Sequence, residues 1–320
     1  MSLISFVMPA YRESTNLRVM VERIAALRAR LAPDEVEAVF VDDHSPDDTP
    51  RILGELSRQH PWVRWARLAR NSGSHTAIQC GLNMARGDAA IILASDGQDP
   101  PELAAEMVPR WKAGAGVVWG ARRSYKRSLL DRTLAWAYYK AMNLLSHVHR
   151  HPTGADMVLI DRRVLETIKA SQERGSGLWE YISWLGFAQE TVFYDKADRL
   201  AGVSGWTFRK KLRAALDNLL GFSYAPIRLM SCSGLLLALV SLGLAGVYTA
   251  NRLAGGALLG LQEAPGWTSL MVVILFVAGA QMLMLGVIGE YLWRIMDHVR
   301  GRPLFVVEHC SDEERREGTG

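Results

Sequence analysis

The chain has 320 residues, a formal net charge of +4 and only three cysteines, Cys80, Cys232 and Cys310. This length allows one domain with a core of normal size plus an appendage. The cysteines lie too far apart for a metal-binding spacing or a disulfide framework, which fits a reducing, cytoplasmic compartment. No basic stretch accompanies a nucleic-acid module motif, so we expect no nucleic-acid partner.

Strand-like and helical segments alternate through the first part of the chain. We expect strands at Leu3–Ala10, Val36–Asp43, Val63–Ala69, Ala89–Asp96 and Gly116–Arg122, and helices at Asn16–Leu31, Thr49–His60, Thr76–Arg86 and Pro101–Ala113. This alternation predicts an α/β fold with a mostly parallel sheet and helices on both faces. Ligands of such sheets bind at the carboxyl ends of the strands.

The pattern after residue 122 is less regular. We expect a long amphipathic helix at Leu129–His149, a mixed region that includes Met157–Ile160, Leu165–Ile168 and Leu178–Phe187, and a strand at Glu190–Tyr194. A basic amphipathic helix follows at Thr207–Phe222. Such a helix either lies in the membrane interface or packs as an ordinary helix.

Two uncharged apolar runs close the chain, one between Arg228 and Arg252 and one between Glu263 and Glu290. Both exceed the roughly 20 residues that a helix needs to cross a bilayer. The two runs would form a transmembrane hairpin, and arginines precede the first run and follow the second. This distribution predicts a multi-pass protein of the inner membrane, with both termini and the catalytic domain in the cytoplasm. The expected domains are a head (1–198), a loop and interface helix (199–228), two transmembrane helices (229–294) and a tail (295–320).

Carboxylates follow two of the expected strands. Asp42 and Asp43 end the second strand, where a carboxylate can accept hydrogen bonds from a base or a ribose. Asp96 ends the fourth, with Gln98 and Asp99 close behind. Hard oxygen ligands suit Mg²⁺ or Mn²⁺, which bind through one or two carboxylates plus substrate phosphates. Helix capping is the competing explanation for each motif taken singly.

The motifs together resemble the inverting family 2 glycosyltransferases with the GT-A (Rossmann-like) nucleotide-sugar fold. More narrowly, the chain is similar to bacterial polyprenyl-phosphate glycosyltransferases, relatives of dolichol-phosphate mannosyltransferase. The resemblance covers nearly the whole chain, through the segments Val7–Leu17, Val41–Thr49, Arg70–Asp88, Asp96–Glu102, Gly154–Val164, Arg199–Lys211, Gly289–Ile295 and Arg300–Glu308.

The resemblance implies a role for individual residues. Asp156, Asp96 and Arg199 would be catalytic, and Asp96 with Gln98 would hold Mg²⁺ or Mn²⁺. The nucleotide would be bound by Pro9, Tyr11, Glu13, Asp42, Asp43 and His75. The acceptor phosphate would meet Arg122, Arg132, Arg199 and Ser204, and Ser204 and Trp206 would belong to a mobile loop.

Two positions depart from the family pattern. The usual Asp-x-Asp reads Ala94-Ser95-Asp96, so the first carboxylate is missing. The usual Ser-Lys-Tyr of the loop reads Ser204-Gly205-Trp206, which removes a lysine that Arg209 or Lys210 would replace.

The resemblance implies inverting transfer of a hexose from a nucleotide-diphosphate sugar to undecaprenyl or another polyprenyl phosphate, for modification of a cell-envelope glycan. UDP-glucose is the first expectation for the donor and GDP-mannose the second. A processive polysaccharide synthase would need more spans, and a non-catalytic nucleotide-sugar-binding scaffold is the other rival. Small residues in the first run (Ser241, Gly243, Ala245, Gly246) permit close helix packing, either in a homo-oligomer or within the hairpin.

Overall fold

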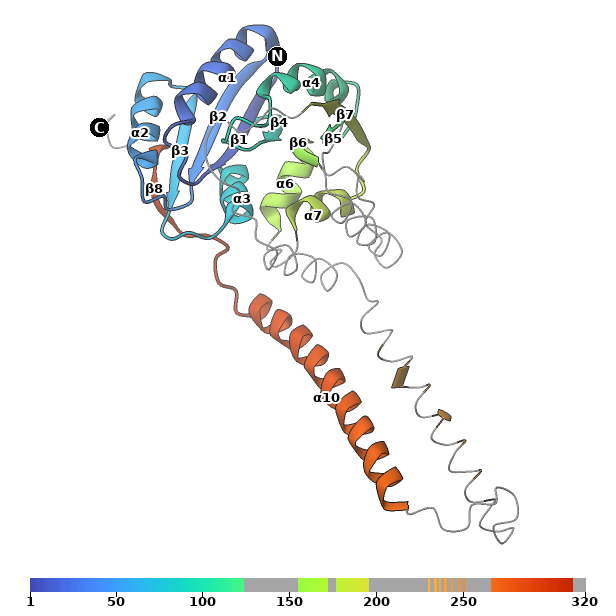
Figure 1. Ribbon diagram of the computed structural model, residues 1–320. Coiled ribbons are helices and arrows are strands. Elements are labelled where there is room, and N and C mark those ends of the chain that lie inside the picture. The colour runs from blue at the N-terminus through green and yellow to red at the C-terminus, as the bar shows by residue number, and fades with distance from the viewer. Residues whose placement is uncertain are drawn as a thin grey trace. The chain divides into compact units, whose positions relative to one another are not determined.

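The computed structural model describes residues 1–123, 155–171, 177–195 and 266–312, with scattered positions between 230 and 250 (Figure 1). The chain forms two compact units. One unit joins Met1–Asn218 with Arg302–Gly320, and the other is Leu219–Gly301. The first unit therefore contains residues that precede the second unit in the sequence and residues that follow it.

An eight-stranded sheet forms the first unit, with the strand order β7-β5-β6-β4-β1-β2-β3-β8. Parallel pairing links β1 to β2 and β4, β2 to β3, and β5 to β7. The strands are β1 (Leu3–Ala10), β2 (Glu35–Asp42), β3 (Val63–Leu68), β4 (Ala89–Ile92), β5 (Val117–Arg122), β6 (Ala155–Asp161), β7 (Gln189–Tyr194) and β8 (Val307–Cys310).

Helices cover both faces of the sheet, as the sequence predicts (Figure 1). Helices α1, α2 and α4 contribute to the apolar core on one face, with residues such as Ile24 against Phe6 and Phe40. Helices α3, α6 and α7 contribute to the core on the other face. Their bounds are α1 (Leu17–Leu31), α2 (Thr49–Gln59), α3 (Ser74–Met84), a 3₁₀ turn η1 (Pro101–Leu103), α4 (Ala104–Lys112), α6 (Arg162–Ala170) and α7 (Leu178–Trp184).

The sheet is mixed: six of its eight strands run in one direction, which agrees with the expectation of a mostly parallel sheet, and β6 and β8 run the other way. Strand β6 runs antiparallel to both of its neighbours, β4 and β5. Its residues Met157–Ile160 are all buried, so they lack the polar alternation that marks a half-exposed strand. Strand β8 runs antiparallel to β3 and comes from the segment that the sequence assigns to a tail.

Helix α3 packs closely on the sheet at Gly81. A Cβ atom at this position would lie 2.5 Å from Cγ1 of Val7 and 3.2 Å from Cγ2 of Val41. Real Cβ atoms do not approach neighbours so closely, because the contact lies well inside the usual separation of carbon atoms. The glycine therefore sets the distance between α3 and the strands β1 and β2.

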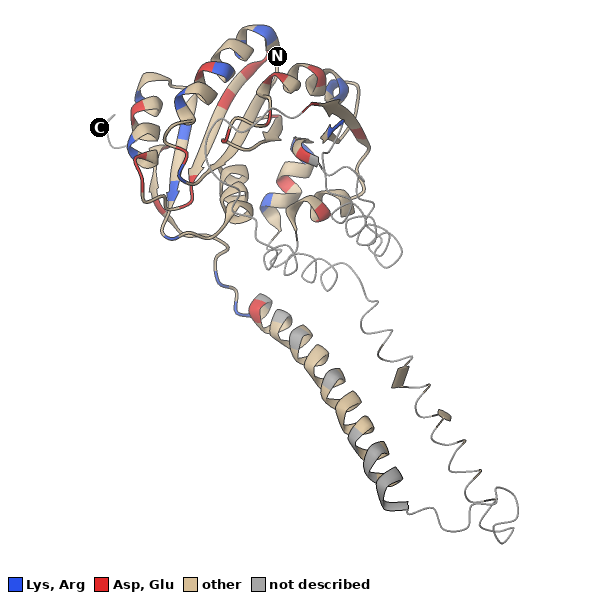
Figure 2. Ribbon diagram, viewed as in Figure 1, with Lys and Arg blue, Asp and Glu red and all other residues tan. Residues whose placement is uncertain are grey.

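One helix of the second unit, α10 (Gly266–Val299), contains the second expected span. Within it, Phe276–Asp297 is long and apolar enough to cross a membrane, and it is the one such segment among the described residues. Figure 2 shows the described part of α10 without charge except near its carboxyl-terminal end. The first expected span lies mostly outside the described residues, and its described positions, among them Met230 and Ala250, have helical backbone.

Candidate active site

Two loops at the carboxyl end of the sheet are tied together by hydrogen bonds. They follow β1 and β2, the strands that the sequence identifies as carrying the nucleotide motifs. The amide of Asp43 donates to the carbonyl of Ala10 at 2.9 Å. The amide of Arg12 donates to Oγ of Ser45 at 3.0 Å. Adjacent parallel strands thus bring the two motifs side by side, as expected for this edge.

Asp42 is completely buried at the end of β2. Its Oδ1 accepts a hydrogen bond from the amide of Ser45 at 3.0 Å, which closes the turn, and its Oδ2 lies 3.5 Å from Nη1 of Arg67. Burial raises the pKa of the Asp42 carboxyl, while Ser45 and Arg67 act in the opposite direction. Asp42 therefore shapes the candidate nucleotide loop from inside.

Asp43 holds the loop that precedes α3. Its Oδ1 accepts from the amide of Ser72 at 2.7 Å and its Oδ2 accepts from the amide of Gly73 at 2.8 Å. Burial raises the pKa of the Asp43 carboxyl, and these two amides lower it. The half-buried ring of His75 lies one residue into the helix that starts at Ser74. The structure therefore places Asp43 and His75 on neighbouring segments.

The first loop carries the other three expected nucleotide residues. The carbonyl of Pro9 accepts from Oγ of Ser95 at 2.7 Å, so the end of β1 is joined to the turn after β4. Tyr11 is 41% exposed, and the guanidinium of Arg12 lies 5.4 Å from the centre of its ring. An exposed aromatic ring at this edge is available to a ligand. Glu13 is half-buried in the same loop.

Asp96 lies in the turn after β4, where the sequence predicts the metal ligand. Its side chain is almost buried, and Oδ1 accepts from the amide of Gln98 at 3.1 Å. Among the described residues, no group of three or more His, Cys, Asp or Glu could hold a metal ion. A single oxygen ligand from the protein still fits Mg²⁺ or Mn²⁺, because these ions take their other ligands from water and substrate phosphates.

A second polar cluster gathers Asp156, Arg122, Tyr194 and Asp99. Because β6 is antiparallel, its beginning lies at the edge where the parallel strands end, and this places Asp156 beside Arg122 of β5. Nε of Arg122 donates to Oδ2 of Asp156. The Tyr194 hydroxyl donates to Oδ1 of Asp99 at 2.9 Å and lies 3.2 Å from Oδ2 of Asp156. The cluster unites the predicted residues Asp156 and Arg122.

Tyr194 is the member of this cluster that the sequence does not single out, and Asp99 is noted there only as a neighbour of Asp96. Burial raises the pKa of its hydroxyl far above the usual value, and the neighbouring charges of Asp99 and Asp156 raise it further. The hydroxyl therefore stays protonated and acts as a donor at physiological pH. Its position as the last residue of β7 was the available signal, because the other site residues also stand at strand ends.

Three expected site residues lie outside the described part of the chain. They are Arg132, Arg199 and Ser204, which the sequence assigns to the acceptor phosphate and, for Arg199, to catalysis. The expected loop residue Trp206 and the basic helix at Thr207–Phe222 also lie there. Of the four residues expected at the acceptor phosphate, the structure therefore describes Arg122.

Comparison with known proteins decides the family. Residues 5–169, about half of the chain and most of the sheet, match the model described as "Glycosyl transferase family 2". This chain belongs to glycosyl transferase family 2. The match includes the carboxylates at this edge of the sheet, from Asp42 to Asp156, whereas Tyr194 lies beyond it.

Similar proteins extend the match over nearly the full length of this glycosyltransferase. A bactoprenol glucosyl transferase of Shigella phage SfII is 34% identical over 307 residues, which cover 95% of this chain and 97% of the relative. A prophage bactoprenol glucosyl transferase homolog of Escherichia coli is 33% identical over 310 residues, which cover 96% of this chain and 99% of the relative. Among solved structures, a mannosyltransferase from Pyrobaculum calidifontis in complex with GDP-Man and Mn²⁺ has a TM-score of 0.46 at 18% identity, covering 88% of this chain and 86% of that chain.

Proposed function

We propose that this glycosyltransferase moves a hexose from a nucleotide-diphosphate sugar to a polyprenyl phosphate at the cytoplasmic face of a membrane, with inversion at the anomeric carbon. Glucose from UDP-glucose is the proposed donor group. The observation that carries the proposal is the end-to-end similarity to proteins named bactoprenol glucosyl transferase, which covers 95% of this chain and 97% of the relative from phage SfII.

The chemistry that the described residues support is a single displacement. The acceptor phosphate has a second pKa near about 6, so it is mostly dianionic at pH 7 and needs little help from a general base. Asp156 is held by Arg122, and the Tyr194 hydroxyl lies close by. We assign Asp156 to orienting the sugar and stabilising positive charge on it. Arg122 offers a planar cation suited to phosphate.

A divalent cation is part of the proposal, with Asp96 as its protein ligand and Gln98 as a second candidate. The donor set fits, because Asp96 supplies a carboxylate at the edge of the sheet where the donor would bind. When bound, Mg²⁺ or Mn²⁺ offsets the charge of the departing nucleoside diphosphate. With Ala94 in place of the first aspartate, this chain's contribution rests on one carboxylate.

The chain connectivity supports a two-helix hairpin in the inner membrane. Strand β8 pairs with β3, so chain on both sides of the second unit belongs to the same head. A chain that leaves the head and returns to it crosses a bilayer an even number of times. If α10 crosses once, a second crossing lies within residues 219–265. The uncharged run between Arg228 and Arg252 has the length for it.

The decisive experiment is transfer of radiolabelled sugar to undecaprenyl phosphate by the full chain in detergent. UDP-glucose, GDP-mannose and other UDP-sugars are supplied one at a time, with Mg²⁺, Mn²⁺ or EDTA. We expect a lipid-extractable product from UDP-glucose that disappears with EDTA. Folded protein that yields no lipid product from any donor would refute the proposed acceptor.

Two carboxylate variants refine the assay. We expect Asp96→Asn to abolish transfer at any concentration of Mg²⁺ that wild type can use. Glu190→Gln is the matched control, because Glu190 is an exposed carboxylate on β7 that pairs only loosely with Arg110 at 3.4 Å. Near-normal transfer by Asp156→Asn would show that this carboxylate is not essential.

A further inference from the structure

The strand β8 follows β3 along the outer edge of the head, although it comes from the segment after α10. Ala66 is opposite Cys310, Arg67 is opposite His309, and the amide of Ala69 donates to the carbonyl of Val306 at 2.9 Å. Because the pair is antiparallel, the first residues of β8 lie at the carboxyl end of β3. That is the edge of the sheet with the candidate nucleotide loops.

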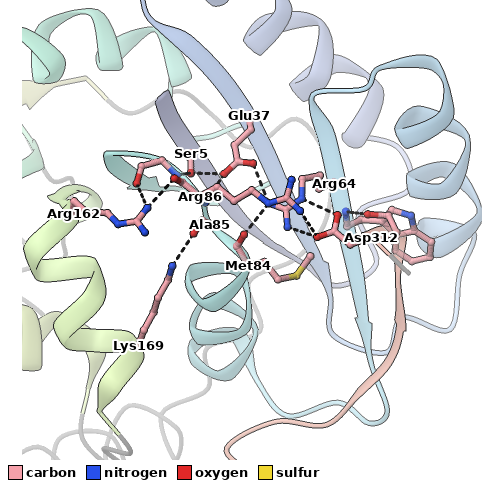
Figure 3. Close-up of polar contacts among 12 residues, drawn as sticks. Ser5, Glu37, Arg64, Met84, Ala85, Arg86, Arg162, Lys169 and Asp312 are labelled. Carbon is pink, nitrogen blue, oxygen red and sulfur yellow. Dashed lines mark hydrogen bonds and ion pairs between the residues drawn. The ribbon is translucent and has the colours of Figure 1, made fainter. Parts of the chain in front are cut away.

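The other end of this segment, at Asp312, is anchored near the amino-terminal end of β3 (Figure 3). Arg64 is buried, and its Nε donates to Oδ1 of Asp312 at 2.9 Å. The same guanidinium pairs with Glu37 at 3.0 Å and donates to the carbonyl of Met84 at 2.8 Å. Arg86 adds a second cation to Asp312 at 2.9 Å. This network fixes the position of the segment without touching the candidate active site.

The near end contacts the nucleotide loop through Glu308. Nε of Arg67 donates to Oε2 of Glu308 at 2.9 Å. Nδ1 of His44 lies 3.1 Å from the carbonyl oxygen of Leu68 and 3.5 Å from the same Glu308 oxygen, so both groups surround this ring nitrogen. Arg67 in turn lies 3.5 Å from Oδ2 of the buried Asp42, and its Nη2 donates to the carbonyl of Ser45 at 3.5 Å. One carboxylate of the tail thus lies beside His44, which is part of the turn, and Arg67, which contacts the turn.

The turn itself depends on outside support. His44 has a positive φ of 57°, a conformation that side chains other than glycine adopt at a cost. Among the described residues, Oδ2 of Asp42 has no hydrogen-bond donor, so Arg67 is the cation that assists Ser45 in offsetting the buried charge of this carboxylate. A long arginine side chain has many rotamers, and Glu308 restricts them.

We propose that Glu308 is a positioning residue for the nucleotide-binding loop, holding Arg67 and His44 so that the turn Asp42–Ser45 keeps the shape that binds the donor's nucleoside diphosphate. The segment that follows the membrane helix thereby completes the donor side of the site. This inference rests on the proposed function, because it requires that the loop bind a nucleotide.

The test is calorimetric titration of UDP and GDP into the full chain in detergent, with Mg²⁺ present, for wild type, Glu308→Gln, Glu308→Lys and Asp312→Asn. We expect Glu308→Gln to raise the Kd of the bound nucleotide about two- to fivefold, the range that a half-exposed ion pair gives. Glu308→Lys, which repels Arg67, should raise it more. In the transfer assay the donor KM should rise while kcat and the acceptor KM stay the same.

Asp312→Asn is the matched control, since it alters the other end of the same segment. It should lower Tm by several degrees, because Arg64 loses one of its partners in a buried position, while the nucleotide Kd stays at the wild-type value. A Kd for Glu308→Gln and Glu308→Lys equal to wild type would overturn the inference. So would an equal rise in Kd for Asp312→Asn, because any loosening of β8 would then suffice. Wild type that binds neither UDP nor GDP would refute the proposed function itself.

Discussion

The hydroxyl of Tyr194 joins two carboxylates of the candidate site, and Tyr194→Phe removes it with little change of shape. The hydroxyl donates to Asp99 at 2.9 Å and lies 3.2 Å from Asp156. Both Tyr194 and Asp99 are buried, so water cannot easily take the place of the lost hydroxyl, and the unpaired carboxylate destabilises the fold. We expect the variant to lose both stability and activity.

The size of each effect follows from the burial of the two carboxylates. A hydrogen bond to a charged group contributes about 1.5–3 kcal/mol, and Asp99 is 1% exposed, so we expect a loss of about 2 kcal/mol in the free energy of unfolding. For a domain of this size, that lowers Tm by about 4–8 °C. The side chain of Asp156 is 26% exposed, and in the variant it keeps its ion pair with Arg122. Removal of the Tyr194 hydroxyl therefore only partly loosens the orientation of Asp156. A tenfold fall in kcat corresponds to about 1.4 kcal/mol and is the expected order.

The assay combines thermal unfolding in detergent with transfer of labelled sugar to undecaprenyl phosphate. Tyr181→Phe is the matched control, because the Tyr181 ring stacks on Trp184 and its hydroxyl makes no hydrogen bond with any of the described residues. The control should leave Tm and kcat unchanged. Wild-type Tm together with wild-type kcat in Tyr194→Phe would refute the reasoning, since the hydroxyl would then hold neither carboxylate.

Three further predictions concern stability and reactivity. Gly81→Ala should lower the free energy of unfolding, measured by urea denaturation, by about 1–3 kcal/mol, because the new methyl group overpacks the core. Gly54→Ala is the control and should cause no such loss, because the nearest atom to its new Cβ would be 3.7 Å away. Burial raises the pKa of Cys80 to about 12, so mass spectrometry should find it unmodified by iodoacetamide at pH 8 until the protein is unfolded. Burial alone would raise the pKa of Asp161, but hydrogen bonds led by Trp111 hold it below 3.8, so the Tm advantage of wild type over Asp161→Asn should shrink as pH falls below that value.

Most of the parallel half of the sheet follows from sequence periodicity. Strands β1, β2, β3 and β5 lie within one residue of the expected bounds, because each is a compact apolar run followed by a turn or helix signal. The strand β4 stops at Ile92, four residues before the expected end, since Asp96 belongs to a turn that the buried Asp99 closes through the amide of Ala94 at 3.3 Å. Local hydrogen bonds of this kind are not visible in a hydropathy pattern.

The antiparallel strands show where sequence reasoning stops. Strand β8 has only four residues, and its partner β3 lies more than 230 positions earlier, so no local pattern announces the pairing. The same distance in sequence hides the contact of Glu308 with Arg67. Asp156 was identified through the family resemblance, yet its approach to Arg122 depends on the antiparallel direction of β6, which pattern alone does not give. Tyr194 ends a strand that the pattern does predict, but its contacts with Asp99 and Asp156 join residues far apart in the sequence, which the pattern does not reveal.

The position of β8 in the chain bears on how the protein is made. Ribosomes deliver β3 long before β8, and the whole of α10 is translated in between. During that interval the outer edge of β3 has exposed backbone donors and acceptors, the kind of edge that pairs with other chains. Arg64 also lacks its partner Asp312 until the residues after α10 emerge. The sheet of the catalytic head is therefore completed only after α10 has been synthesised, and the open edge of β3 must stay unpaired until then.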